Sequence, residues 1–99
     1  MPDEIVWTKK KGKAITLGLA KSLVTERGVS FVELVAVGTE VERGMAIGLV
    51  TARKGREYEI ESPIAGTIKK VNTAVNCVDD PKVLNDDPEG MGWLVVIEK

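Results

Sequence analysis

The stretch from Leu49 to Gly66, LVTARKGREYEIESPIAG, decides the fold. Residues 45–52, MAIGLVTA, and residues 57–62, EYEIES, are both typical of strands, and the polar break between them contains Lys54 and Gly55. Two strand-like runs around a short break with a glycine predict a β-hairpin. The sequence therefore places Lys54 at the crest of a hairpin.

The rest of the chain has the turn residues and short apolar runs of a β-rich protein. Further strands are expected at residues 4–8, 14–18, 29–37, 64–71 and 90–99, with a turn over residues 9–13 and a turn followed by a short alternating piece over residues 38–44. Apolar residues at helical spacing predict a short helix over residues 19–27 that stops at Gly28. Asp80 as N-cap and Pro81 in the first helical position predict a second short helix.

Short strands spaced about ten residues apart are typical of a sandwich or barrel. With 99 residues, the chain has the length of one domain. We therefore expect a single all-β domain over residues 1–99, a flattened barrel or sandwich of two small antiparallel sheets with two short helices.

Composition narrows the class of function. The chain has no histidine, one cysteine (Cys77) and a net charge of -1. Histidine is the commonest general base near neutral pH, so its absence excludes a Ser/His or Cys/His nucleophile pair and a His-ligated zinc site. A near-neutral charge gives no electrostatic reason to expect nucleic acid. We expect a binding or carrier module rather than an enzyme, with no catalytic residue and no metal.

The sequence also bears on the compartment. No apolar run approaches membrane-spanning length, and MPDEIVW lacks the basic and apolar regions of a secretory signal. One cysteine cannot form an internal disulfide, which fits a reducing compartment. We expect a cytoplasmic protein with no membrane partner.

Five segments, in order, resemble the H protein family of the glycine cleavage system, a relative of lipoyl and biotinyl carrier domains. They are EIVWTKKKGKAITLGLA at 4–20, VSFVELVAVGTEVERG at 29–44, VTARKG at 50–55, SPIAGTIKKVN at 62–72 and PKVLNDDPEGMGWL at 81–94. The resemblance runs through most of the chain and implies a lipoyl/biotinyl-carrier-like hybrid fold. VTARKG stands in the place of the family's V-E-S-V-K-A, which puts the family's lipoylated lysine on Lys54.

The resemblance implies a lipoyl carrier of the glycine-cleavage H type, with lipoate bound covalently to Lys54 by a lipoate ligase or lipoyl transferase. In the family, the arm takes an aminomethyl group from glycine decarboxylase and presents it to the aminomethyltransferase. Dihydrolipoyl dehydrogenase then reoxidises the arm. Tethering raises the effective concentration of the group at each active site, so the carrier needs no catalytic residue.

Five features depart from the family pattern: the stretch between Gly18 and Phe31 is one residue shorter, the helical tail that usually follows the last strand is missing, and three more lie near Lys54 or Trp7. Thr51 stands where lipoyl families usually have an acidic residue, the arm after Lys54 is one residue longer, and no histidine precedes Trp7. These departures indicate an H-like paralogue and leave two alternatives open: an unmodified H-like interaction module, and a lipoate-binding protein of another pathway such as sulfur oxidation. Biotin is less favoured, because its carriers usually flank the lysine with methionines, and here the neighbours are Arg53 and Gly55.

Other residues have simpler interpretations. Arg53 and Arg56 are expected to be solvated turn residues, with docking to an acidic partner surface as the alternative. Cys77 is expected to be a small buried or semi-exposed residue. The aromatic residues Trp7, Phe31, Tyr58 and Trp93 are expected in the core or half-buried in a sheet. Helix capping around the prolines explains Asp79, Asp80, Asp86 and Asp87 better than a calcium site does.

Overall fold

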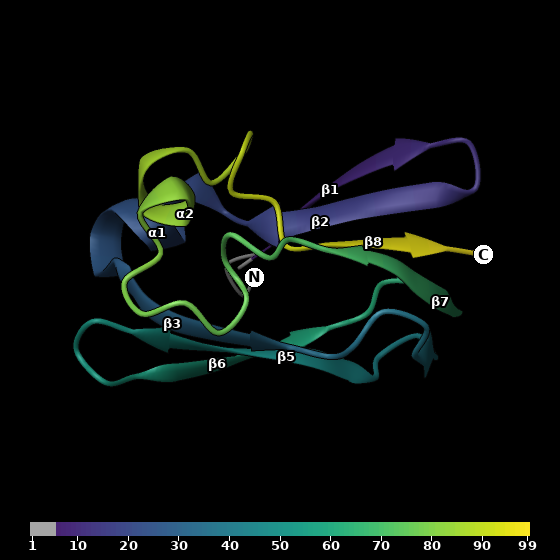
Figure 1. Ribbon diagram of the computed structural model, residues 1–99, viewed down its shortest axis with the longest axis horizontal. Coiled ribbons are helices and arrows are strands. Elements are labelled where there is room, and N and C mark those ends of the chain that lie inside the picture. Colours follow the sequence, from purple (N-terminus) through teal and green to yellow (C-terminus); the bar gives the residue numbers. More distant parts are fainter. Residues whose placement is uncertain (1–5) are drawn as a thin grey trace.

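The computed structural model describes residues 6–99. The elements in chain order are β1 (Val6–Lys11), β2 (Ala14–Leu19), α1 (Lys21–Arg27), β3 (Val29–Leu34), β4 (Glu40–Val41), β5 (Ala46–Ala52), β6 (Glu57–Glu61), β7 (Gly66–Val71), α2 (Lys82–Asp86) and β8 (Val95–Glu98) (Figure 1). The strands form a five-stranded sheet, β1-β2-β8-β7-β4, and a three-stranded sheet, β3-β5-β6, with antiparallel pairing throughout. The predicted two-sheet all-β fold with two short helices is confirmed.

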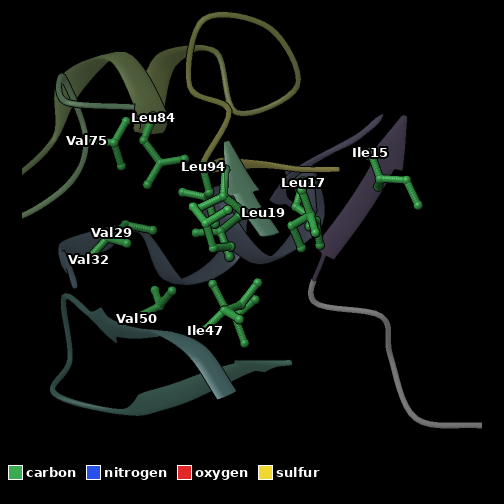
Figure 2. Packing of buried hydrophobic residues seen from close by; sticks show 14 of the residues in the cluster. Ile15, Leu17, Leu19, Val29, Val32, Ile47, Val50, Val75, Leu84 and Leu94 are labelled. Carbon is green, nitrogen blue, oxygen red and sulfur yellow. The ribbon is translucent and has the colours of Figure 1, made fainter. Parts of the chain in front are cut away.

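The two sheets bury their facing sides against each other, and the molecule measures 34 × 32 × 21 Å. Side chains from both sheets meet in one cluster, which includes Leu17, Leu19, Val32, Ile47, Val50, Ile60, Ile68, Leu94 and Ile97 (Figure 2). Val24 of α1 and Leu84 of α2 join this cluster. Both helices lie at the end of the sandwich from which the β5–β6 loop projects (Figure 1).

The first helix is shorter than predicted. Leu19 is the last residue of β2, where it pairs with Val6 and is fully buried, so α1 begins only at Lys21. Gly28 ends the helix as predicted: it has a φ of 69°, and its N–H donates to the Val24 carbonyl over 2.9 Å.

The N-cap assigned to Asp80 is wrong by one residue. Pro81 is the N-cap of α2, without a side-chain cap hydrogen bond, and the helix begins at Lys82. Asp80 has a φ of 48°, and its N–H donates to the Ser30 carbonyl over 2.7 Å. This bond ties Asp80 to β3, and its carboxylate forms an ion pair with Arg53 instead of capping the helix.

The predicted turn over residues 9–13 is smaller than expected. Lys9, Lys10 and Lys11 continue β1 and pair with β2, so only Gly12 and Lys13 form the turn. β1 is an edge strand, and lysines are favoured there because their charge opposes pairing with another chain. Residues 4 and 5 of the predicted first strand lie outside the described residues.

Several predicted strands are shorter in the structure. β3 ends at Leu34, β7 begins at Gly66 and β8 begins at Val95. Before β8, buried Asn72 donates through Nδ2 to the carbonyls of Met91 and Trp93, at 2.9 and 2.8 Å. A side chain therefore satisfies backbone groups that a strand would have paired with its neighbour.

A second asparagine fastens α2 to β3. Asn85 accepts from the Val29 N–H over 2.8 Å and donates to the Val29 carbonyl over 2.9 Å. The amide thus imitates a β-bridge at the start of β3. The helical end of the sandwich is in this way fixed to the sheet that carries Lys54.

Candidate functional site

Lys54 lies in the four-residue link, residues 53–56, between β5 and β6, at the helical end of the sandwich (Figure 1). The Ala52 carbonyl accepts from the Gly55 N–H over 2.9 Å, and the Ala52 N–H donates to the Arg56 carbonyl over 2.7 Å. This pattern is a turn followed by a left-handed residue, the usual form of a three-residue hairpin loop. Gly55 fills the left-handed position with a φ of 91°. The predicted hairpin, with Lys54 exposed at its crest, is present.

Backbone hydrogen bonds between neighbouring strands hold the base of the loop. β5 pairs with β6 from Thr51–Glu57 downward and with β3 from Ala52–Val29 downward. The lysine backbone therefore rests on the middle strand of a three-stranded sheet, while its side chain extends beyond the last bonded pair. Pairing on both sides of β5 therefore fixes the base of the loop that carries Lys54.

The two neighbouring arginines have partners within the protein. The Arg53 side chain lies across Gly28, where a Cβ would come within 2.8 Å of the Arg53 Cδ, and its Nε is 3.4 Å from Asp80 Oδ1. The Arg56 guanidinium lies over the Tyr58 ring, 5.6 Å from its centre. Both arginines are exposed as predicted, but each also contacts the fold.

Within residues 6–99, the structure gives the Lys54 side chain neither an ion pair nor a hydrogen bond. Nothing lies within 4 Å of the position that a Cβ on Gly55 would occupy. The lysine amine is therefore accessible, and space is open next to it. The arrangement suits attack of this amine on an activated acyl group held by another protein.

Thr51, the departure at the position three before Lys54, lies next to an acidic residue of the adjacent strand. In the sheet register Thr51 pairs with Glu57 of β6, which is exposed. Directly paired residues share a face of the sheet, with Cβ atoms about 5 Å apart. The Glu57 carboxylate thus lies beside position 51, although residue 51 itself is a threonine. The alternation of E-Y-E-I-E in β6 was the sequence signal for it.

The other candidate residues do not converge on a site. Cys77 is exposed, and not buried or semi-exposed as predicted; it has a φ of 58°, and its thiol contacts Asn76 Oδ1 over 3.5 Å. The four aromatic residues are half-buried, as predicted. Among the described residues no group of three or more carboxylates or thiols could hold a metal ion. Asp87 instead accepts from the Met91 N–H over 3.0 Å.

Comparison with known proteins gives the family. The family model described as Glycine cleavage H-protein matches residues 1–99. The chain belongs to this family. Among proteins named glycine cleavage system H protein, that of Prochlorococcus marinus (strain MIT 9515) is 33% identical over 97 residues, which cover 97% of this chain and 73% of the relative. That of Anaeromyxobacter sp. (strain K) is 36% identical over 93 residues, or 93% of this chain and 70% of the relative.

A solved structure gives the same family. The crystal structure of a glycine cleavage system H protein (GCVH) from Mycobacterium marinum superposes with a TM-score of 0.78 at 31% sequence identity. The superposition covers 94% of this chain and 76% of that chain. The two-sheet arrangement that presents Lys54 is therefore that of a glycine cleavage H protein.

No helix among residues 6–99 is long and apolar enough to cross a membrane.

Proposed function

We propose that this protein is a lipoyl carrier of the glycine-cleavage H type, with lipoate attached through an amide bond to the Nζ of Lys54. The observation that carries the proposal is the position of Lys54, an exposed lysine without a partner among residues 6–99, at the tip of a hairpin in an H-protein fold. The open space at Gly55 fits the attachment, because an active site and an acyl chain can approach the amine.

The attached group supplies the chemistry, namely a dithiolane that accepts an aminomethyl group and electrons. The protein supplies the position. Residues of β5 and β6 hold the lysine backbone, and Gly55 allows the turn. Arg53 fixes the base of the loop to Gly28 and Asp80. A carrier of this kind needs no general base or nucleophile of its own, in agreement with the absence of histidine from the chain.

The partners follow from the family in this proposal. A lipoate ligase or lipoyl transferase attaches the group to Lys54. Glycine decarboxylase, aminomethyltransferase and dihydrolipoyl dehydrogenase then use the arm in turn, and tethering keeps its end at a high effective concentration at each active site. We place this cycle in the cytoplasm, since the single cysteine fits a reducing compartment.

Two alternatives have a specific basis in the sequence. Thr51 and the longer arm after Lys54 distinguish this chain from the usual family pattern. They leave room for an unmodified interaction module, or for a lipoyl carrier that serves another pathway such as sulfur oxidation. The first alternative has an unmodified Lys54, and the second has a modified Lys54 that the glycine cleavage enzymes do not accept.

The function is tested with the lipoylated protein, glycine decarboxylase and glycine. We expect one aminomethyl group per arm, measured as a mass increase of the intact protein when the arm is supplied in its oxidised, dithiolane form. A lipoylated H protein from one of the relatives above is the positive control. If the control is loaded and this protein is lipoylated but not loaded, the protein serves another pathway. If Lys54 is unmodified both after ligase treatment and in protein from its native cell, the carrier function is wrong.

Position 51 provides a second prediction. Thr51→Glu should raise the initial rate of lipoylation when the ligase is limiting, because it adds a carboxylate beside the loop. The gain should be small, about two- to threefold, since Glu57 already places a carboxylate on that face. Like charges directly opposite each other should also destabilise the hairpin by about 0.5 kcal/mol, measured by urea denaturation. Equal rates for the two proteins at all ligase concentrations would show that position 51 does not control modification.

A further inference from the structure

The outer face of the β3-β5-β6 sheet is acidic along its edge strand. Glu57, Glu59 and Glu61 alternate along β6 and are all exposed, whereas Tyr58 is half-buried and Ile60 is buried. This strict alternation places the three carboxylates on the side of the sheet that faces away from the core. The five-stranded sheet lies on the opposite side (Figure 1).

An apolar groove lies on the same sheet, with a carboxylate on either side. The groove has a volume of about 330 Å³, and its lining includes Leu34, Val35 and Leu49, with Glu33 and Glu59. In the register, Leu49 of β5 pairs with Glu33 of β3 and with Glu59 of β6. Because neighbouring strands lie about 4.8 Å apart, the two carboxylate-bearing backbones stand roughly 10 Å apart across Leu49. Leu49 is 37% exposed, so its side chain is accessible to a partner.

These carboxylates have no cation partner in the described part of the chain. The ion pairs among residues 6–99 are Arg53–Asp80 and Lys69–Glu98, and neither involves the outer face of the small sheet. Unpaired like charges repel one another and give the fold no stability. An apolar seat between two such charges is complementary to an aliphatic side chain flanked by basic ones.

The loop geometry determines from which side an enzyme reaches Lys54. On the inner side, the Arg53 side chain packs across Gly28 and pairs with Asp80, so the α1–β3 turn and the segment before α2 cover this side of the loop. On the outer face Glu57 is exposed and Thr51 is half-buried, and neither forms an ion pair or a side-chain hydrogen bond within residues 6–99. An enzyme that binds the unmodified amine must approach the loop closely, since a lysine side chain is short, and the open approach is over the outer face.

An interface of ordinary size that is centred on the Lys54 loop would extend as far as the groove. A standard interface buries about 800 Å² on each partner, which corresponds to a patch of roughly 16 Å radius. Glu59 is five residues from Lys54, or roughly 16 Å along an extended strand. A patch centred on the lysine loop therefore reaches the groove and its two carboxylates.

We infer that the groove between Glu33 and Glu59 is the docking seat for a basic segment of the enzyme that lipoylates Lys54, with an aliphatic side chain of that segment resting on Leu49. This inference depends on the proposed function. A second copy of this chain is a poor occupant, because a two-fold interface would bring the carboxylates of the two copies together. The later enzymes of the cycle reach the end of a long arm and have less need to contact this face.

The test is the rate at which a lipoate ligase modifies the intact protein as a function of salt concentration. The double variant Glu33→Gln/Glu59→Gln should raise KM about tenfold at low salt with kcat unchanged, because it removes steering and ground-state binding only. Its rate should also depend less on salt than that of the unaltered protein. Leu49→Ala should raise KM severalfold without changing the salt dependence.

Two control variants match these changes on another part of the surface. Glu40→Gln/Glu42→Gln removes the same charge from exposed residues of β4 and the turn after it. Met91→Ala truncates another exposed apolar residue, in the turns before β8. Both should retain the KM of the unaltered protein, and the melting temperatures of all variants should agree within a few degrees.

The possible outcomes separate this inference from the function on which it rests. If the ligase modifies Lys54 but Glu33→Gln/Glu59→Gln behaves like the Glu40→Gln/Glu42→Gln control, the docking seat is wrong and the carrier function stands. If the unaltered protein sediments as a dimer that Leu49→Ala dissociates, a second copy occupies the groove and the inference is overturned. If Lys54 is not modified in any variant or in cells, the proposed function itself fails.

Discussion

Replacing Lys54 by arginine should abolish lipoylation and leave the fold unchanged. Arginine retains the positive charge, so the field at the loop stays the same, but its guanidinium does not form the amide. Lys54 is exposed at a turn and has no hydrogen-bond or ion-pair partner among residues 6–99, so the free energy of unfolding should change by less than about 0.5 kcal/mol. Intact mass after incubation with a lipoate ligase, ATP and lipoate measures the first effect, and thermal denaturation measures the second.

The matched controls are other exposed lysines of the same chain. Lys69→Arg and Lys70→Arg change lysines of β7, on the five-stranded sheet, and both variants should still gain one lipoyl group. Peptide mapping should place that group on residues 53–56. A lipoyl group on Lys69 or Lys70 of the unaltered protein would mean that the extra residue after Lys54 had shifted the alignment with the family. The attachment site would then be wrong although the fold is right.

The hairpin that carries Lys54 could be predicted because local signals agree there. Strand-like arms and a turn with Gly55 all indicate the same structure, and the arms lie within one residue of their expected limits. The two-sheet class also followed from the spacing of short strands. In both cases residues close in the chain determine the outcome, so pattern and structure coincide.

The errors occur where distant residues decide the local structure. Asp80 has the sequence of an N-cap, but its backbone bonds to Ser30 and its carboxylate pairs with Arg53, and these residues are 50 and 27 positions away in the chain. Leu19 suits a helix by its spacing, but pairing with Val6 keeps it in a strand. Tertiary contacts outweigh propensity at such positions, since propensity differences are usually below about 1 kcal/mol.

The surroundings of the candidate site show the same division. The sequence indicates Lys54 through the hairpin and the family resemblance, but it does not show that Glu57 faces Thr51 or that Glu33 and Glu59 lie on either side of Leu49. Those relations depend on the register of three strands, and the register of β3 against β5 shifts by one residue between Val29 and Phe31. A shift of one residue turns every side chain of a strand to the other face of the sheet. Which side chains share a face can therefore be known only from the structure.

Asn72 should be the polar residue on which stability depends most. Its side chain is buried, donates to the carbonyls of Met91 and Trp93, and accepts from the Ala74 N–H over 3.1 Å. Asn72→Ala would leave three backbone groups without these partners. An unsatisfied buried group costs about 1–3 kcal/mol, and water can reach part of this site in the variant, so we expect a loss of about 3 kcal/mol. For a protein of this size that is a fall in melting temperature of roughly 10–20 °C.

Asn72→Asp separates the hydrogen bonds from the packing, because aspartate has nearly the same shape. Its carboxylate can still accept from the Ala74 N–H, but it would face the Met91 and Trp93 carbonyl oxygens without a proton to donate. At neutral pH this variant should be at least as unstable as Asn72→Ala, since a buried charge would oppose two carbonyl dipoles. The neighbouring exposed Thr73→Ala is the control and should change stability by less than about 0.5 kcal/mol. An Asn72→Asp protein as stable as the unaltered one would show that packing, and not the two donated bonds, holds the segment before β8.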